Sequence, residues 1–173
     1  MEYRNRQSDF EQGKATDAYR FMGCQLSDEG ATFRVWAPAA TGVSVIGDFN
    51  EWNAAAHPMT RISNAGVWEL TIPAIKKFDN YKYCIRAGGR ELIKTDPYAF
   101  HAETHDATAG KAYPLDDGYV WGDAAYLAAR RQKNIYRAPV NIYEAHIGSW
   151  RRYADGNVFD YRKFADEMVA YLT

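Results

Sequence analysis

Apolar and polar residues alternate along several short segments that begin near residue 30. In residues 32–36, Phe33 and Val35 point to one side of the chain and Arg34 points to the other. Alternation with period two is typical of strands that are buried on one face only. Apolar residues alternate or run together again in residues 43–46, 67–72, 81–86 and 91–94. Short strands at this spacing predict a β-sandwich.

Turn residues separate these segments. Gly88 and Gly89 lie between the segments 81–86 and 91–94, and such a pair suits the positive φ angles of a tight hairpin. In the segment 67–72, Trp68, Leu70 and Ile72 share one face, which we expect to line the core.

Alternation alone does not decide whether some large or charged residues of the predicted strands are buried or exposed. We expect Trp36, like Trp68, to belong to the core. We expect Arg34 and Glu69 to lie on solvated strand faces, because charged side chains are seldom buried.

The segments that flank the predicted sandwich have other patterns. Residues 1–25 are polar and mixed, which indicates a short helix or an arm. Residues 122–132 are rich in alanine and predict a short helix. Residues 140–147 read as a buried strand, and apolar residues recur at helical spacing after Asp160, the candidate N-cap. A strand, a loop and an amphipathic helix make one β/α unit.

Charge and cysteine content narrow the classes of partner and compartment. The 173 residues have a formal net charge of -1, so nucleic acids and anionic membranes have no general electrostatic reason to bind. We interpret the two cysteines, Cys24 and Cys84, as free thiols of a reducing compartment. The first residues lack the apolar segment of a signal peptide, and no apolar run approaches the roughly 18 residues that span a bilayer. We therefore expect a cytoplasmic protein.

Three segments carry a resemblance to a known family. They are residues 33–40 (Phe-Arg-Val-Trp-Ala-Pro-Ala-Ala), residues 47–53 (Gly-Asp-Phe-Asn-Glu-Trp-Asn), and residues 81–83 (Tyr-Lys-Tyr) with Asp96 and Pro97. Together they resemble the family-48 carbohydrate-binding module, and the run at 47–53 is fairly specific for it. That module is an immunoglobulin-like sandwich that precedes many α-amylase-type catalytic barrels.

Two more segments extend the resemblance over nearly the whole chain. Residues 143–150 (Tyr-Glu-Ala-His-Ile-Gly-Ser-Trp) look like the first barrel strand of bacterial 1,4-α-glucan branching enzymes, and residues 10–23 are similar to the entry segment of those enzymes. The resemblance implies a mainly β chain. It would consist of an N-terminal arm (1–25), an immunoglobulin-like module (26–117), a helical linker (118–139) and the first β/α unit of an incomplete TIM barrel (140–173).

The resemblance also implies that the catalytic residues lie elsewhere. The catalytic groups of the family are two aspartates and one glutamate placed after later barrel strands. Glycosyl transfer with retention requires two carboxyl groups about 5 to 5.5 Å apart, and a barrel presents such groups at the C-terminal ends of its strands. Residues 140–173 supply one β/α unit of the barrel. We therefore expect no catalytic residue and no activity in this chain, and the resemblance implies no metal or organic cofactor.

The expected role is to bind and position α-glucan, such as glycogen, starch or maltooligosaccharides. The rest of the chain's own barrel would be the other partner. In the intact enzyme the barrel would cleave an α-1,4 bond and rejoin the piece as an α-1,6 branch. Two alternatives remain open: a non-catalytic glycogen-binding interaction module, and the N-terminal part of a related debranching or trehalose-releasing hydrolase. The barrel-like segment at 143–150 argues against the interaction module.

The candidate glucan-binding residues are Trp52, Asn53, Lys82 and Ile93. Trp52 lies in a turn rich in Gly, Asp and Asn, where it either stacks on a glucose ring or folds back onto the sandwich. Lys82 is expected on the face opposite its two tyrosine neighbours, and the matching lysine of the family donates hydrogen bonds to sugar hydroxyls; an ordinary solvated lysine is the alternative. Ile93 stands where many strong binders of the family have a second tryptophan, so we expect weak binding.

Four residues of a loop-like segment, His101, Glu103, His105 and Asp106, alternate as metal ligands on a strand can. No distant pair of ligands matches them, so we do not expect a metal site.

The barrel-like segment contains a second set of candidates. Glu144 and His146 lie two residues apart, on one side of the predicted strand. We expect this segment to shape the floor of the active site in the intact enzyme and to take no part in proton transfer. Tyr143, His146 and Trp150 are the expected substrate contacts.

Overall fold

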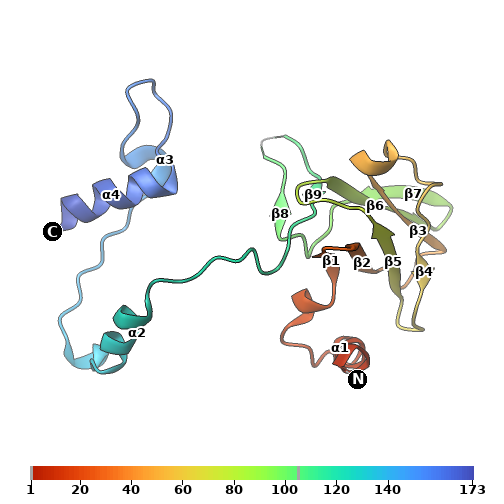
Figure 1. Cartoon of the computed structure of the whole chain (residues 1–173), viewed down its shortest axis with the longest axis horizontal. Coiled ribbons are helices and arrows are strands. Elements are labelled where there is room, and N and C mark those ends of the chain that lie inside the picture. The colour runs from red at the N-terminus through yellow and green to blue at the C-terminus, as the bar shows by residue number, and fades with distance from the viewer. Residues whose placement is uncertain (1, 105) are drawn as a thin grey trace. The chain divides into compact units, whose positions relative to one another are not determined.

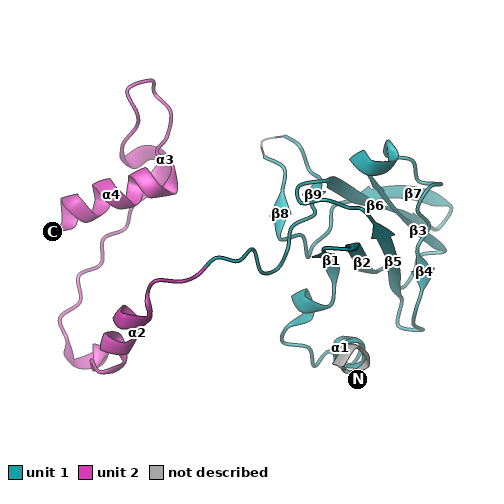
Figure 2. Cartoon of the chain, in the orientation of Figure 1, with its two compact units in different colours: residues 1–119 teal, residues 120–173 magenta. Residues whose placement is uncertain are grey.

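The computed structural model describes residues 2–104 and 106–173. The chain divides into two compact units, residues 1–119 and residues 120–173 (Figures 1 and 2). In the part of the chain that the structure describes, no helix has the length and apolar character to cross a bilayer.

The first unit is built from two antiparallel sheets (Figure 1). One sheet has the order β1-β2-β5-β4; the other has the order β3-β6-β9-β8, with β7 paired to β6. The orders β1-β2-β5-β4 and β3-β6-β7 correspond to the ABED and CFG sheets of the constant-type immunoglobulin sandwich. The strands are β1 (Gly23–Ser27), β2 (Gly30–Trp36), β3 (Gly42–Gly47), β4 (Thr60–Arg61), β5 (Val67–Pro73), β6 (Asn80–Ala87), β7 (Arg90–Lys94), β8 (His101–Ala102) and β9 (Gly110–Lys111).

Side chains from both sheets form one core between them. Phe33 of β2 lies edge-on to Tyr81 of β6, with ring centroids 5.0 Å apart, and both are fully buried. Trp68 and Ile72 are also buried in this core, with Leu70 packed against it, as the alternation in β5 predicted. The two cysteines are buried free thiols.

The five strands predicted from alternation are all present, as β2, β3, β5, β6 and β7. The hairpin at Gly88 and Gly89 is confirmed as well, since both residues have positive φ angles and Ala87 pairs with Arg90. The sequence did not predict β1, β4, β8 and β9. Of these, β1 falls mostly within the segment that was expected to be an arm.

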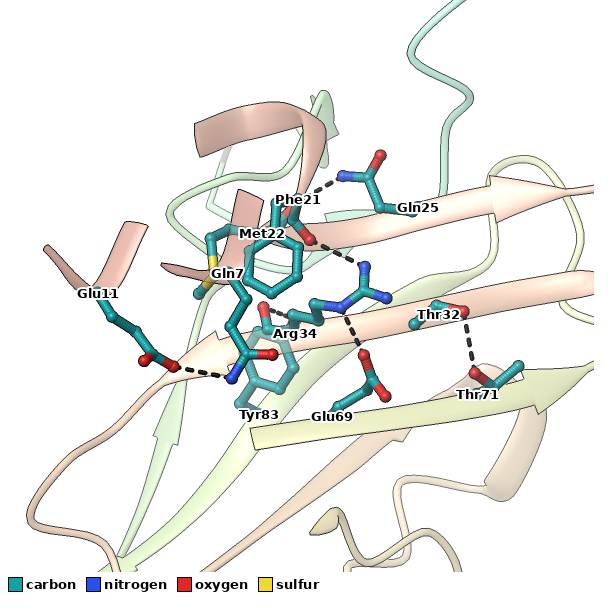
Figure 3. Close-up of polar contacts among 10 residues, drawn as sticks. All are labelled: Gln7, Glu11, Phe21, Met22, Gln25, Thr32, Arg34, Glu69, Thr71 and Tyr83. Atoms are coloured by element: carbon teal, nitrogen blue, oxygen red, sulfur yellow. Dashed lines mark hydrogen bonds and ion pairs between the residues drawn. The ribbon is translucent and has the colours of Figure 1, made fainter. Parts of the chain in front are cut away.

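The prediction that Arg34 and Glu69 face solvent is wrong for Arg34 (Figure 3). Arg34 is buried because the N-terminal segment covers its side of the sheet. Its Nη1 donates to the Phe21 carbonyl at 3.0 Å and its guanidinium lies 4.7 Å from the centre of the Phe21 ring. Its Nε pairs with Glu69 Oε2 at 2.6 Å, and the Glu69 side chain is 25% exposed. The covering segment contains α1 (Glu2–Glu11) and the 3-10 turn Ala18–Arg20.

The expectation that Trp36 belongs to the core is also wrong, because its side chain is 56% exposed. Trp36 is the last residue of β2 and lies on the Arg34 side of the strand, whereas Phe33 and Val35 occupy the core side. Its indole N–H donates to the Ala65 carbonyl at 2.8 Å.

The second unit is helical and contains no strand. Its elements are α2 (Ala124–Arg131), the 3-10 turn Ile135–Arg137, α3 (Ile147–Trp150) and α4 (Tyr161–Leu172). The predicted helices at 122–132 and after Asp160 are confirmed, and Asp160 caps α4 by accepting from the Lys163 amide at 2.8 Å.

The predicted strand at residues 140–147 is wrong. Residues 140–146 form neither helix nor strand, and α3 begins at Ile147. A strand takes its backbone hydrogen bonds from neighbouring strands. Within residues 120–173, the one β-type pairing is the isolated bridge between Arg152 and Val158, so nothing in this unit supplies those partners.

Candidate functional site

A hydrogen-bonded turn joins the end of β3 to the candidate residue Trp52. It contains a 3-10 turn at Asp48–Asn50. The Asn50 side chain holds the turn from inside: its Oδ1 accepts from the Gly47 amide at 2.9 Å and its Nδ2 donates to the Val45 carbonyl at 3.0 Å. Gly47 is required by space, because a Cβ there would lie 2.2 Å from the Asn80 carbonyl oxygen.

Trp52 is held in an unusual conformation at the end of this turn. Its φ is 59°, a left-handed angle that bulky residues rarely adopt. Its amide donates to the Gly47 carbonyl at 3.0 Å and its indole N–H donates to Asp48 Oδ1 at 3.1 Å. The side chain is nevertheless 40% exposed. The polar edge of the indole is thus fixed to the turn, and the exposed part of the ring can contact a ligand.

Asp48 connects this turn to β6. Its second oxygen, Oδ2, accepts from the backbone N–H of Asn80 at 3.3 Å, two residues before Lys82.

Lys82 lies opposite Ile46 of β3 and on the face opposite the fully buried Tyr81 and Tyr83, as the sequence predicted. Its Nζ is 2.7 Å from the hydroxyl of Thr108. The ammonium group is therefore positioned by a neighbour and keeps further donors for a ligand.

The other two candidates of the sandwich have different surroundings. Asn53 closes the turn after Trp52, because its Oδ1 accepts from the Ala55 amide at 2.9 Å. Ile93 is opposite Cys84 in the β6–β7 pair, on the same face of the sheet as Lys82, and is 58% exposed. Ile93 offers an apolar surface without a flat ring.

Sequence reasoning missed two residues that support this surface. Asp48 belongs to the Gly-Asp-Phe-Asn run that identified the turn, so its position there was the available signal. Thr108 carried no signal, because it follows an irregular segment and reaches Lys82 through the tertiary fold.

In the second unit, the structure brings two of the three predicted substrate contacts together. The indole N–H of Trp150 donates to the Tyr143 hydroxyl at 3.2 Å. Both rings pack near Tyr171 of α4, with centroids 5.7 and 5.8 Å from it. His146 is placed separately, with its Nδ1 2.9 Å from the Ser149 hydroxyl.

Two of the candidate metal ligands make contacts with other residues of the protein. Glu103 Oε2 accepts from the Ala109 amide at 2.9 Å, and His101 stacks on Tyr113. His105 lies outside the described residues. Among the residues that are described, no three His, Cys, Asp or Glu side chains gather as a metal site requires.

Comparison with known proteins matches part of the first unit to a carbohydrate-binding family. Residues 21–99 match the model of carbohydrate-binding module 48 (isoamylase N-terminal domain). Over 94% of its length the chain is 39% identical to the 1,4-alpha-glucan branching enzyme GlgB of Bacillus cytotoxicus, of which it covers 26%. Over the same share it is 43% identical to GlgB of Nitrosospira multiformis, of which it covers 22%. A solved apo pullulanase from Klebsiella pneumoniae is 33% identical over 56% of this chain and 11% of the pullulanase, with a TM-score of 0.47.

The chain therefore spans about a quarter of the length of the curated relatives that it matches. Residues 21–99 are a carbohydrate-binding module of family 48, in a chain that is homologous along nearly its whole length to the N-terminal quarter of GlgB branching enzymes.

Proposed function

We propose that the sandwich binds α-glucan at the surface around Trp52 and Lys82. The observation that carries this proposal is the exposed Trp52 ring, which is held by Asp48 in a left-handed backbone conformation. Backbone strain of this kind costs of order 1 to 3 kcal/mol and is common at ligand-binding positions. A structural role alone does not account for a strained tryptophan that stays 40% exposed.

The chemistry of the surface fits a sugar ring. The CH face of a glucose unit is apolar and stacks on the indole, which combines apolar burial with attraction to the ring quadrupole. The Lys82 ammonium donates hydrogen bonds to hydroxyl oxygens at the edge of that ring. Because Ile93 supplies no second aromatic face, binding is weak, with a dissociation constant in the high micromolar range or above.

In the longer protein, the module would hold glucan chains near a branching-enzyme barrel. The relatives are named 1,4-alpha-glucan branching enzymes. Within a complete barrel, residues 140–147 would find the neighbouring strands that the isolated unit lacks, and Tyr143, His146 and Trp150 would contact substrate. The carboxyl groups that cleave the α-1,4 bond and form the α-1,6 branch would come from the remainder of that protein. Residues 1–173 alone would show no turnover of amylose in an iodine-absorbance assay.

Migration in native gels that contain glycogen tests the binding proposal. The 173-residue chain should be retarded in proportion to the glycogen concentration, and Trp52→Ala should lose most of this retardation. Trp36→Ala is the matched control, because Trp36 is also an exposed tryptophan with its indole N–H bonded to the protein. Equal retardation of the wild type and Trp52→Ala would refute the proposed site.

A further inference from the structure

A second exposed aromatic residue of the sandwich has the same unusual backbone as Trp52. Within the described residues, the non-glycine positions with positive φ are Glu51, Trp52, Ala74 and Phe78. Phe78 has a φ of 77°, and its amide is held by the Ala112 carbonyl at 2.7 Å. Its side chain is 48% exposed. The left-handed conformation is unfavourable for an L-residue, and the half-exposed Phe78 side chain gains little burial in return.

Phe78 is part of a cluster of three rings, which we call the Phe78 cluster. His101 of β8 lies edge-on to Phe78, with centroids 5.3 Å apart and planes at 85°. Tyr113 stacks against His101 at 5.3 Å and 29°. The three rings come from three separate segments, and β9, which pairs with both β6 and β8, holds these segments together (Figure 1). The cluster is thus a property of the tertiary fold.

One cation and one carboxylate border the cluster. Lys77 Nζ lies 4.3 Å from the centre of the Tyr113 ring, and the Tyr113 hydroxyl donates to Asp117 Oδ2 at 3.0 Å. Opposite charges therefore border the same ring. A surface of aromatic rings with a balanced polar rim suits a neutral, hydroxyl-rich ligand better than an anion.

The Phe78 cluster and Trp52 lie at the same end of the sandwich. Asn80, two residues after Phe78, donates its backbone N–H to Asp48 Oδ2 at 3.3 Å. The other oxygen of that carboxylate accepts the indole N–H of Trp52. Two strained, exposed aromatic residues are therefore connected through one aspartate.

We infer that the Phe78 cluster is a second sugar-stacking site, which binds the same α-glucan chain as Trp52 at a different glucose unit. This inference rests on the proposed function. Each site alone binds weakly, but a chain already held at one site is at a high effective concentration for the other. Affinity therefore rises with chain length once a glucan spans both sites. A glucan too short to reach from Trp52 to the Phe78 cluster gains nothing from the second site.

The test compares Phe78→Gly and Trp52→Ala in the 173-residue chain, titrated with maltotriose and with a longer linear amylodextrin. Phe78→Gly removes the ring and suits the positive φ, so its urea stability should equal or exceed that of the wild type. We expect it to weaken amylodextrin binding about tenfold, while the binding of maltotriose at Trp52 stays unchanged. Tyr19→Ala, which removes another exposed aromatic ring of the first unit, should change neither affinity.

The outcomes separate this inference from the proposed function. If Trp52→Ala abolishes binding of both sugars and Phe78→Gly changes neither affinity, the second site is refuted and the proposed function stands. If NMR signals of Phe78 and Tyr113 shift with sugar and Trp52→Ala has no effect, the cluster binds glucan and the Trp52 site is refuted. If signals of the cluster do not shift with amylodextrin, the inference is wrong.

Discussion

The indole N–H of Trp52 donates to Asp48 Oδ1 at 3.1 Å, and the second oxygen of this aspartate accepts from the first amide of β6. The exposed ring is therefore attached to both the turn after β3 and the strand that carries Lys82. Because the ring and the lysine share these supports, the geometry of the proposed binding surface depends on the packing of the turn.

Gly47→Ala should disrupt this turn. The added Cβ would lie 2.2 Å from the Asn80 carbonyl oxygen, a backbone atom that cannot move away without shifting β6. We expect a loss of about 1 to 3 kcal/mol in the free energy of unfolding, measured with urea. Gly42→Ala in the same strand is the control, because its nearest heavy atom would be 3.8 Å away. Equal stability of the two variants would contradict the close packing of residue 47 against the Asn80 carbonyl.

Glu69→Ala should destabilise the sandwich by about 1 to 3 kcal/mol, since it removes the carboxylate from a buried guanidinium. The Arg34 and Glu69 side chains are only 10% and 25% exposed. Glu91→Ala breaks the Arg86–Glu91 pair, whose side chains are 52% and 54% exposed, and should cost no more than about 1 kcal/mol. Chemical unfolding of both variants measures the difference. A Glu69→Ala loss as small as that of Glu91→Ala would contradict the role given to Arg34.

Asp96 is a buried carboxyl group that is bonded to two tyrosines of β6. Its Oδ2 accepts from the hydroxyls of Tyr81 at 2.6 Å and Tyr83 at 3.3 Å, and its Oδ1 accepts from the Tyr98 amide at 2.8 Å. Burial raises the pKa of Asp96 above its ordinary value of 3.8, although these hydrogen bonds act in the opposite direction.

The raised pKa predicts how Asp96 affects stability with pH. The folded protein binds this proton more tightly than the unfolded chain, so the contribution is fully present below pH 3.8 and is lost as pH rises through the folded pKa. The free energy of unfolding of the wild type, minus that of Asp96→Asn, should therefore fall as the pH increases from about 3 to neutrality. If this difference in the free energy of unfolding grows with pH instead, the hydrogen bonds outweigh burial in setting the pKa of Asp96.

Alternation predicted the central strands because one face of each packs against the opposite sheet. Phe33 and Val35 are buried as this logic requires. The same logic failed for Arg34, because alternation assumes that the other face meets water, whereas Phe21 and the N-terminal segment cover it. Local pattern carries no information about such a covering segment.

The strand predicted at 140–147 failed for a related reason. An apolar run indicates a strand only where neighbouring strands can pair with it, and the second unit contains no strand. At the candidate site, the Gly-Asp-Phe-Asn run located the turn and Trp52. Composition gave no hint that Phe78, His101 and Tyr113 gather in space, because these residues belong to three separate segments.

Rates of amide hydrogen exchange should differ between the sandwich and the segment at residues 138–146. Residues 138–146 form neither helix nor strand, so their amides should exchange far faster than those of β5 and β6, which carry the fully buried Val67 and Tyr81. Pairing of this segment with a second copy of the chain would restore protection, because an unpaired strand edge is a template for association. Strong protection of residues 138–146 in a proven monomer would contradict the interpretation that this segment needs partner strands.

The most direct test of glucan binding is an NMR titration of the 173-residue chain with maltoheptaose. The indole signal of Trp52 should shift, with a dissociation constant in the high micromolar range or weaker, which corresponds to about -5 kcal/mol or less favourable. Trp52→Ala should remove most of this affinity, whereas Trp36→Ala should leave it intact. If Trp52→Ala binds maltoheptaose as tightly as the wild type does, Trp52 is not the stacking platform and the account of this surface is wrong.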